Sequence, residues 1–584
     1  IKPLWSQTVS KPLSVTVSLY MRSMARSLLC SLLVFTTVCT TCCHAYRLEE
    51  DGPVVQTQYG PVKGMYVEEG VIFFGLPFAA PPTGNLRWKP PQPFSTPWAP
   101  TTYDATGDDP KPGCIQPGCK PDAPDPRHKC PRGRKLSEDC LYLNVFAPRT
   151  ALNATAPLPV MFWLYGGEYY SGSANAEIYD GRFLANKTGT IVVTTNYRLG
   201  ALGFLVAGEG EDAAKGNYGI LDQLAALKWV KENIGNFGGD KNRVTTFGQS
   251  AGSGSIGVHL TYNKSAELFQ RAIMMSVPFG IPFRSRWEAL SLGNHFAGLL
   301  NCSNGDMSCL RSASEMDIRK AQRLCKKFTV NPFQPLEMFI PWGPTIDGDI
   351  IQEQLVDSFA KGHLQRKPFI IGTVMEESRL YIYGNWRTPM STTLYNAVIF
   401  GIFREKALSV LGEYKPGSAA DQRDHLAVAA TDFLLTCPTR TAIRGAAEGG
   451  NRDVWLYVFD HIWSFKGIWE GEESCDGHCC HGEDIPFTLQ TISFTGQNMT
   501  AEEQVMADSI AYHYGNFAHT GDPNKPGRRA DAPGTAGVGA GVTWPRYDED
   551  GGFTNLKIST PKNELVQEYK KDRCDFWHKL NDYP

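Results

Sequence analysis

Several short apolar runs are spread along the chain, each rich in β-branched or aromatic residues and bounded by turn residues. This pattern is typical of strands that are buried on both faces of a sheet. The runs are Val160–Leu164, Ile191–Thr195, Val244–Phe247, Phe369–Gly372 and Val454–Phe459.

A helix is predicted between the second and third of these runs, over Ile220–Ile234. Its apolar residues fall near one face of a 3.6-residue period, and glycines follow where a helix would end. The apolar positions are Leu221, Leu224, Ala225, Leu227, Val230 and Ile234, and the glycines are Gly235, Gly238 and Gly239. Strand, helix and strand in succession predict an α/β fold with a large, mostly parallel central sheet flanked by helices.

Composition adds little to this picture and excludes some partners. The 584 residues are 42% hydrophobic and 20% charged, which is ordinary for a globular protein, and the net charge is −3. Such a charge gives no reason to expect nucleic acid or an anionic membrane as a partner. Two irregular stretches, Asp104–Asp139 and Gly521–Gly541, are predicted to be surface loops rather than domain linkers.

The N-terminal region resembles a targeting segment. The chain begins at Ile1 rather than at a methionine, so we interpret residues 1–20 as an upstream non-native segment. Residues 21–45 then have the pattern of a signal peptide, with Arg22 and Arg26 before the short apolar run Leu28–Val38. That run is shorter than the roughly 20 apolar residues of a membrane span, although an uncleaved anchor is the alternative. We therefore expect a secreted, extracellular protein with one domain over residues 46–584.

Cysteines and sequons agree with this expectation. Of the 16 cysteines, four (Cys30, Cys39, Cys42 and Cys43) precede the expected cleavage site, which leaves an even 12. An even number in a secreted chain suggests disulfides, and spacing suggests the pairs Cys302–Cys309, Cys114–Cys140 and, nested within the last, Cys119–Cys130. Sequons for N-glycosylation occur at Asn153, Asn186, Asn263, Asn301 and Asn498.

The most informative segment follows the third apolar run and reads Gly248-Gln249-Ser250-Ala251-Gly252. In this Gly-x-Ser-x-Gly pattern the serine stands on a sharp strand-to-helix turn, where larger flanking side chains would collide. The following residues, Ser253–Leu260, can form a helix whose N-terminus favours negative charge beside Ser250. By itself the motif is short, so a glycine-rich turn with an incidental serine is the alternative.

With this motif, the chain resembles the type-B carboxylesterases, a family that includes the cholinesterases. The resemblance covers nearly all of Tyr59 to Trp577 and implies the α/β-hydrolase fold. Its blocks are Phe74–Ala79, Pro81-Pro82, Leu86–Trp88, Ser137–Asn144, Asn196–Gly200, Gly216–Gly219, Asp222-Gln223 and Asn236–Asp240.

The resemblance implies a Ser-His-Glu triad in which Ser250 is the nucleophile. A serine hydroxyl needs a base to take its proton, and the base needs a carboxylate to orient it. Glu377 matches the family's acid, although Ser378 replaces the usual glycine after it, and Glu376 is its competitor. His481, followed by Gly482 and Glu483, matches the family's base, with His478 as the rival.

The family also implies an oxyanion hole formed by backbone N–H groups. Here these groups belong to Gly167, Glu168 and Ala251. Glu168 replaces a glycine, so a carboxylate now stands beside the site where negative charge develops. At roughly 5 Å and an effective dielectric constant of about 20, that charge would raise the barrier by about 3 kcal/mol. We expect Glu168 to turn to solvent or to pair with a cation; alternatively, it replaces the carboxylate lost at Gln249, where cholinesterase-like members carry Glu, or it acts as a second base on water.

The loop before His481 allows a different interpretation, because Cys475, His478, Cys479, Cys480 and His481 are all potential zinc ligands at short spacing. In an oxidising compartment a disulfide in this loop is the simpler reading. We therefore expect no metal and no cofactor. Near the C-terminus, the resemblance implies that Cys574 pairs with Cys437, whereas Cys325 has no obvious partner.

The resemblance predicts an esterase that hydrolyses uncharged or amphipathic carboxylic esters through an acyl-enzyme intermediate. Choline esters are poor candidates, because cholinesterases place a key tryptophan inside the first disulfide loop and residues 115–139 contain no Trp, Tyr or Phe. The alternatives are a catalytically silent binding or adhesion protein and a stoichiometric inhibitor scavenger. The sequence does not indicate the physiological substrate or the oligomeric state.

Overall fold

The computed structural model describes residues 52–119, 129–469, 471–527 and 542–580. The expected upstream segment and signal peptide, residues 1–45, lie outside these ranges, as do parts of the two predicted surface loops. The first described residue of the domain expected over residues 46–584 is therefore Gly52. Within the described ranges, no helix combines the length and the apolar character needed to cross a membrane.

The centre of the fold is a sheet with the strand order β20-β19-β18-β17-β14-β13-β9-β10-β8-β4-β3. In chain order these strands are β3 (Met65–Tyr66), β4 (Val71–Pro77), β8 (Tyr142–Ala147), β9 (Leu158–Leu164), β10 (Ile191–Thr195), β13 (Gly239–Gln249), β14 (Arg271–Met275), β17 (Phe369–Val374), β18 (Val454–Phe459), β19 (Thr554–Ile558) and β20 (Glu564–Gln567). The strands predicted from the apolar runs are β9, β10, β13, β17 and β18, which all lie in the middle of this sheet.

Strand direction changes from the centre of the sheet to its ends. All neighbouring pairs from β10 through β9, β13, β14, β17 and β18 to β19 are parallel. The pairs β10–β8, β8–β4, β4–β3 and β19–β20 at the two ends are antiparallel. The predicted α/β fold with a large, mostly parallel sheet is thus confirmed, and the antiparallel strands lie at its edges.

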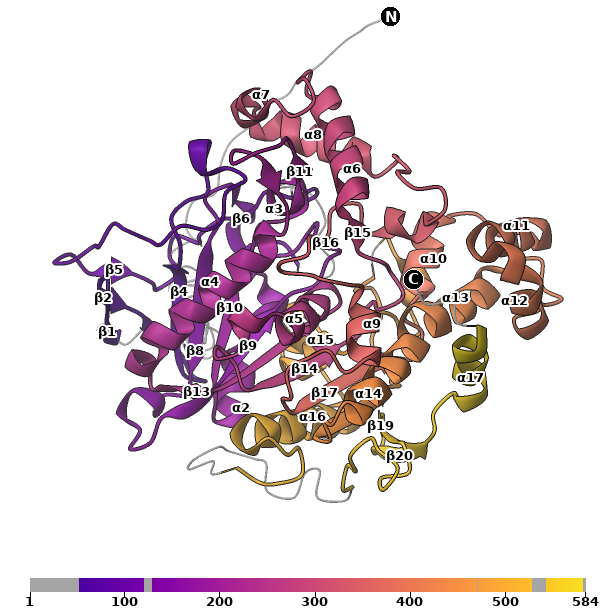
Figure 1. The fold of residues 1–584 in the computed structure, drawn as a ribbon. Helices are drawn as coiled ribbons and strands as arrows, with labels where there is room; N and C mark the ends of the chain where they lie inside the picture. Colours follow the sequence, from indigo (N-terminus) through magenta and orange to yellow (C-terminus); the bar gives the residue numbers. More distant parts are fainter. Residues whose placement is uncertain (1–51, 120–128, 470, 528–541, 581–584) are drawn as a thin grey trace, which may run out of the picture. The chain divides into compact units, whose positions relative to one another are not determined.

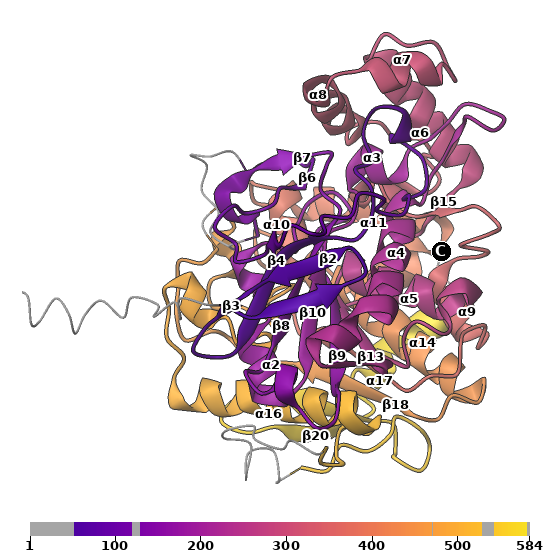
Figure 2. The same ribbon diagram turned by 90° about the vertical axis from the view of Figure 1, so that its left-hand side faces the viewer.

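Helices cover both faces of the sheet. The main ones are α2 (Arg182–Thr188), α3 (Gly200–Phe204), α4 (Tyr218–Asn233), α5 (Ala251–Thr261), α6 (Arg286–Leu299), α7 (Met307–Ser312), α8 (Glu315–Cys325), α9 (Leu355–Ala360), α10 (Arg379–Asn385), α11 (Thr392–Phe403), α12 (Ala407–Glu413), α13 (Arg423–Thr431), α14 (Cys437–Glu448), α15 (Ile485–Thr488), α16 (Ala501–Thr520) and α17 (Lys571–Leu580). Helices α2 and α16 pack together against β9, β10 and β13, while α4, α5 and α9 lie on the opposite side of these strands (Figures 1 and 2).

Apolar side chains are buried in three main clusters. The largest surrounds the central sheet, and it includes Trp163, Phe247 and Trp455. A second lies among α3, α6 and α8, around Trp88 and Trp342. A third joins α11, α13 and α17 around Trp577. The sheet and its two helical layers therefore form the rigid frame from which the loops at the carboxyl ends of the parallel strands project.

Candidate active site

Ser250 lies at a sharp turn between β13 and α5. Its backbone has φ of 57° and ψ of −124°, a conformation that non-glycine residues rarely adopt and that is often found at functional sites. The flanking glycines are required by close packing, because a Cβ at Gly252 would lie 2.0 Å from the carbonyl oxygen of Leu164 and one at Gly248 would lie 2.5 Å from it. The structure thus contains the strand-to-helix elbow that the motif predicts.

Two further loops begin where β17 and β18 end, and their backbones are joined directly. Glu376, in the loop after β17, forms a parallel bridge with Cys480, in the loop that precedes α15. The backbone N–H of Glu376 also donates to the carbonyl oxygen of Cys479 at 3.0 Å. Because Glu377 and His481 each follow a bridged residue, this pairing brings their side chains to the same place.

Glu377 and His481 form a buried acid–imidazole pair. Nδ1 of His481 lies 2.5 Å from Oε2 of Glu377, and the other carboxylate oxygen accepts the backbone N–H of Val374 at 2.9 Å. Glu377 is 0% exposed and His481 is 6% exposed, so water does not screen the pair. Such a carboxylate fixes the imidazole tautomer with its proton on Nδ1 and would stabilise an imidazolium.

The two rival residues from the sequence, Glu376 and His478, pair with each other instead. Nδ1 of His478 lies 3.0 Å from Oε1 of Glu376, and about a third of each side chain is exposed. The Glu376 carboxylate also accepts the backbone N–H of Cys479 at 2.9 Å. The same two loops therefore carry an inner acid–histidine pair beside Ser250 and an outer pair at the surface.

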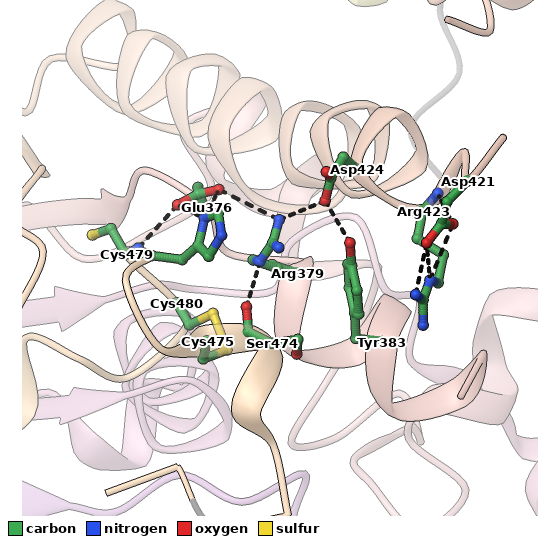
Figure 3. Close-up of polar contacts among 11 residues, drawn as sticks. Glu376, Arg379, Tyr383, Asp421, Arg423, Asp424, Ser474, Cys475, Cys479 and Cys480 are labelled. Atoms are coloured by element: carbon green, nitrogen blue, oxygen red, sulfur yellow. Dashed lines mark hydrogen bonds and ion pairs between the residues drawn. A yellow bond between two sulfur atoms is a disulfide. The ribbon is translucent and has the colours of Figure 1, made fainter. Parts of the chain in front are cut away.

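Arg379, at the start of α10, connects these loops to a neighbouring helix. It lies between Glu376 and Asp424 of α13, close to the Cys475–Cys480 disulfide (Figure 3). Its Nη1 is 2.6 Å from Asp424 Oδ1, and its Nε donates to the carbonyl oxygen of Ser474 at 2.6 Å. The arginine therefore holds the end of the disulfide-closed segment next to the loop that carries Glu377.

The expected oxyanion-hole residues belong to a tight turn after β9 and to the first residue of α5. Gly167, Glu168 and Tyr169 have φ values of 124°, 58° and 56° in succession. Among the described residues, the backbone N–H groups of Gly167, Glu168 and Ala251 have no acceptor. The turn approaches the elbow closely, since a Cβ on Gly166 would lie 2.8 Å from Cβ of Ser250. Unpaired N–H groups beside a serine are what an oxyanion hole requires.

The Glu168 side chain is paired with a cation. Its Oε2 lies 3.2 Å from Nζ of Lys326, which follows α8, and more than a third of each side chain is exposed. The same ammonium group sits 4.4 Å from the ring centre of Tyr170. Of the arrangements considered for Glu168, the structure thus contains the ion pair, which partly neutralises the carboxylate.

An apolar cavity opens above Ser250 and His481. Its lining consists of Glu168, Ser250, Ala251, Pro278, Ile281, Phe339, Ile340, Ser378, Tyr381, Ile382, Ala430, Leu434, Leu435 and His481. The ring of Tyr381 lies 5.3 Å from that of His481, centre to centre. The ionisable residues in this lining are Glu168, Tyr381 and His481, and most of the others are apolar. The cavity therefore suits an uncharged, apolar ligand.

The second ring nitrogen of His481 faces a neighbour of Ser250 rather than Ser250 itself. Nε2 lies 2.9 Å from the amide nitrogen of Gln249, the last residue of β13. Within the described residues, the hydroxyl of Ser250 has no hydrogen-bond partner. Sequence reasoning identified Gln249 only as a lost charge, and no local signal could reveal a contact with a residue 232 positions away.

Two more carboxyl groups lie near this pair. Asp484 accepts a hydrogen bond from the Tyr457 hydroxyl at 3.1 Å, and burial followed by the charge of Glu377 raises the pKa of Asp484 to about 7. Burial also raises the pKa of Glu483, whose carboxylate accepts the indole N–H of Trp469 at 3.1 Å. The acidic pair that follows His481 in the sequence is therefore buried in the protein.

Disulfides join Cys114–Cys140, Cys119–Cys130, Cys302–Cys309, Cys437–Cys574 and Cys475–Cys480. The first four are the pairs expected from spacing and resemblance, and the fifth closes the loop before His481. Among the described residues, Cys325 and Cys479 are free and buried. No group of three or more His, Cys, Asp or Glu side chains in the described part of the chain is arranged to hold a metal ion.

The five sequon asparagines are at or near the surface. Asn153, Asn263, Asn301 and Asn498 are exposed, and Asn186 is partly buried. Asn186 and Asn498 line the same surface groove, between α2 and the segment before α16. Their glycosylation remains an expectation from the sequence.

Comparisons with known proteins agree with this architecture. The family model described as the Carboxylesterase family matches residues 51–577. The chain is 34% identical over 472 residues to a protein of Dictyostelium discoideum named Crystal protein, an alignment that covers 80% of this chain and 82% of that protein. It is 33% identical over 487 residues to the cAMP-regulated D2 protein of the same organism, with 82% and 86% covered. It is 31% identical over 558 residues to the acetylcholinesterase of Bungarus fasciatus, with 90% and 86% covered. With its eleven-stranded sheet and its serine elbow, the chain belongs to the carboxylesterase family, whose fold is the α/β-hydrolase fold.

Proposed function

We propose that the protein is a secreted serine carboxylic-ester hydrolase in which Ser250 is the nucleophile, His481 the base and Glu377 the acid that orients the base. The observation that carries this proposal is the buried pair of Glu377 and His481 at 2.5 Å, beside a serine at a strained elbow. Ser250 and His481 line the same cavity, so an ester bound there would be within reach of both.

The proposed reaction has two halves. Ser250 Oγ attacks the carbonyl carbon of the ester while Nε2 of His481 takes the hydroxyl proton, and Glu377 stabilises the resulting imidazolium. The carbonyl oxygen becomes an oxyanion held by the N–H groups of Gly167, Glu168 and Ala251. Its collapse expels the alcohol, which takes the proton from His481. Water then attacks the acyl-enzyme with His481 as base, and this releases the carboxylic acid and restores Ser250.

The cavity supports esters with an apolar acyl or alcohol group. Its walls carry Phe339, Leu434 and Leu435 together with isoleucines, and the charge of Glu168 is partly neutralised by Lys326. One relative is named an acetylcholinesterase, but no tryptophan lines this cavity in the described part of the chain. Uncharged or amphipathic esters are therefore better candidates than choline esters.

The test is covalent labelling with a fluorophosphonate probe, followed by hydrolysis of p-nitrophenyl esters of increasing acyl length. We expect Ser250→Ala to abolish labelling and His481→Ala or Glu377→Gln to slow it by roughly 10³-fold or more. The outer pair offers matched controls, because His478→Ala and Glu376→Gln change the same residue types in the same loops. These controls should stay within a few-fold of the unmodified protein. Equal losses in the inner and outer variants would contradict the proposed roles.

A binding or adhesion protein, or a stoichiometric scavenger of inhibitors, is the second candidate. It is favoured by the contact between Nε2 of His481 and Gln249, which leaves the Ser250 hydroxyl without a base in this arrangement. Labelling without ester turnover would favour a scavenger, and folded protein that is neither labelled nor active would favour a binding protein. Secretion and glycosylation can be tested separately, by expressing the chain with residues 21–45 in a eukaryotic cell. The medium should then contain protein whose mass falls on treatment with an N-glycosidase.

A further inference from the structure

Gln249 occupies an enclosed position between the oxyanion turn and the histidine loop. It is 2% exposed and does not line the cavity. A Cβ on Gly166 would lie 2.7 Å from its Oε1, and a Cβ on Gly482 would lie 3.7 Å from its Nε2. The Gln249 side chain is therefore packed between these two glycines, with its amide nitrogen directed at the imidazole of His481.

The positions of the protons on the His481 ring follow from its hydrogen-bond partners. An ionised Glu377 can only accept, so Nδ1 of His481 carries the imidazole proton and Nε2 presents a lone pair. That lone pair accepts an N–H of Gln249 at 2.9 Å. It is the same lone pair that must receive the proton of Ser250 in the proposed reaction, and a nitrogen lone pair accepts one strong hydrogen bond at a time.

We propose that Gln249 is a positioning residue that competes with Ser250 for Nε2 of His481 and keeps the base away from the serine in the resting protein. Attack on an ester then requires the imidazole to leave the amide and turn toward the hydroxyl, with its Nδ1 contact to Glu377 as the pivot. This inference rests on the proposed function, because it concerns how the same serine becomes reactive.

In the described part of the chain, no other group around His481 forms a hydrogen bond with its Nε2. Glu377 contacts the opposite ring nitrogen, and the ring of Tyr381 is tilted by 56° from that of His481 at 5.3 Å, centre to centre. Asp484 is hydrogen-bonded to Tyr457, and Glu483 to Trp469. The backbone of Ser250 is held independently, because its N–H donates to the carbonyl oxygen of Met275 at 2.8 Å. A change at position 249 can therefore release Nε2 without moving the serine.

The experiment compares Gln249→Met and Gln249→Glu with the unmodified full chain by the rate of fluorophosphonate labelling across pH. Methionine has nearly the same length and volume but no donor for Nε2, so Ser250 becomes the nearest donor, and we expect labelling about tenfold faster at pH 7. A glutamate would accept a hydrogen bond from the Nε2–H of the imidazolium and stabilise the charged ring, so labelling should be slower at pH 7. In Gln249→Glu, the acid limb of the pH profile of labelling should also move about one unit or more toward higher pH.

Labelling of the methionine variant at or below the rate of the unmodified protein, with the acid limb of the glutamate variant unchanged, would overturn the inference while the proposed function stood. If the unmodified protein, Gln249→Met and Gln249→Glu all resist labelling although they are folded, both the proposed function and the inference fail. If Gln249→Met does not fold, the shift of the acid limb in Gln249→Glu alone tests the inference. A role in packing would slow both variants without a change in pH profile, so the opposite responses separate competition for Nε2 from a structural role.

Discussion

Oε2 of Glu168 lies 3.2 Å from Nζ of Lys326, although the two residues are 158 positions apart in the chain. The carboxylate belongs to the turn whose N–H groups face the serine elbow, and the ammonium follows a helix of the neighbouring cluster. The ion pair partly neutralises a carboxylate beside the proposed oxyanion, in a turn where the family resemblance implies glycine.

Loss of Lys326 should therefore slow ester hydrolysis. In Lys326→Met, the unpaired Glu168 charge opposes the developing oxyanion, and we expect kcat for an uncharged p-nitrophenyl ester to fall about tenfold, less than an unscreened carboxylate would cause because the pair is partly exposed. Adding Glu168→Gln should restore most of the rate. The neighbouring exposed Lys327, changed to Met, is the control and should have no effect. A tenfold loss that Glu168→Gln does not reverse would exclude the charge as its cause.

Arg379 should support activity through the two loops that it joins. Without its contacts to Ser474 and Asp424, the segment before His481 loses an anchor, so we expect Arg379→Gln to lower kcat by about tenfold with a smaller change in KM. Arg423→Gln is a matched control, because Arg423, like Arg379, lies over the ring of Tyr383, but it pairs with Asp421 and has no hydrogen bond or ion pair with the described residues of the histidine loop (Figure 3). Both variants should melt at lower temperature. Equal kcat in the two variants would argue against a positioning role for Arg379.

The Cys475–Cys480 disulfide should matter for reactivity as well as stability. It closes a loop of similar length to that closed by Cys302–Cys309, with sequence separations of 5 and 7 residues. Replacing either pair by serines should lower the free energy of unfolding by about 2 kcal/mol, measured by urea denaturation. Only the Cys475→Ser/Cys480→Ser variant should also slow fluorophosphonate labelling, because His481 directly follows Cys480. An equal slowing in both variants would show that stability alone controls labelling.

Asp484 should make the protein less stable as pH rises. Its pKa is raised to about 7 in the folded protein, above the ordinary value of 3.8, so the folded state binds more protons than the unfolded state between these values. The stabilising contribution of this group to the free energy of unfolding should therefore be fully present below about pH 4. It should be lost as the pH rises toward 7, by at most about 1.4 kcal/mol per pH unit. Asp484→Asn removes the titration. The variant should gain stability relative to the unmodified protein from pH 5 to pH 8, and a constant difference in urea unfolding would refute this expectation.

The central sheet and the elbow could be predicted from the sequence because their signals are local. Strands β9, β10, β13, β17 and β18 are buried on both faces and read as continuous apolar runs. Edge strands such as β3 and β20 are short and partly exposed, and their residues are mixed in character, so they give no comparable signal. The antiparallel ends of the sheet therefore emerged only from the structure.

The candidate site likewise contains residues that the sequence predicts and residues that it does not. Ser250, Glu377 and His481 stand in motifs that chemistry constrains, and the resemblance predicts each of them as a site residue. The partners Lys326 and Gln249 depend on side-chain directions in the folded chain, which no spacing encodes. Glu376 and His478 were competitors in the sequence, and their mutual hydrogen bond depends on the bridge between Glu376 and Cys480.

Because of that bridge, which acid is buried depends on the number of residues in each loop. Each loop carries its inner residue directly beside the bridged one, so a slip of a single position in either loop would face a surface side chain toward the serine and turn the buried one to water. Insertions or deletions between the end of β17 and Glu377, or between Cys475 and His481, should therefore be far more damaging than changes of similar size in loops elsewhere. Loop redesign aimed at new substrates should leave these two stretches at their present lengths and alter the cavity wall around Phe339 and Leu434 instead.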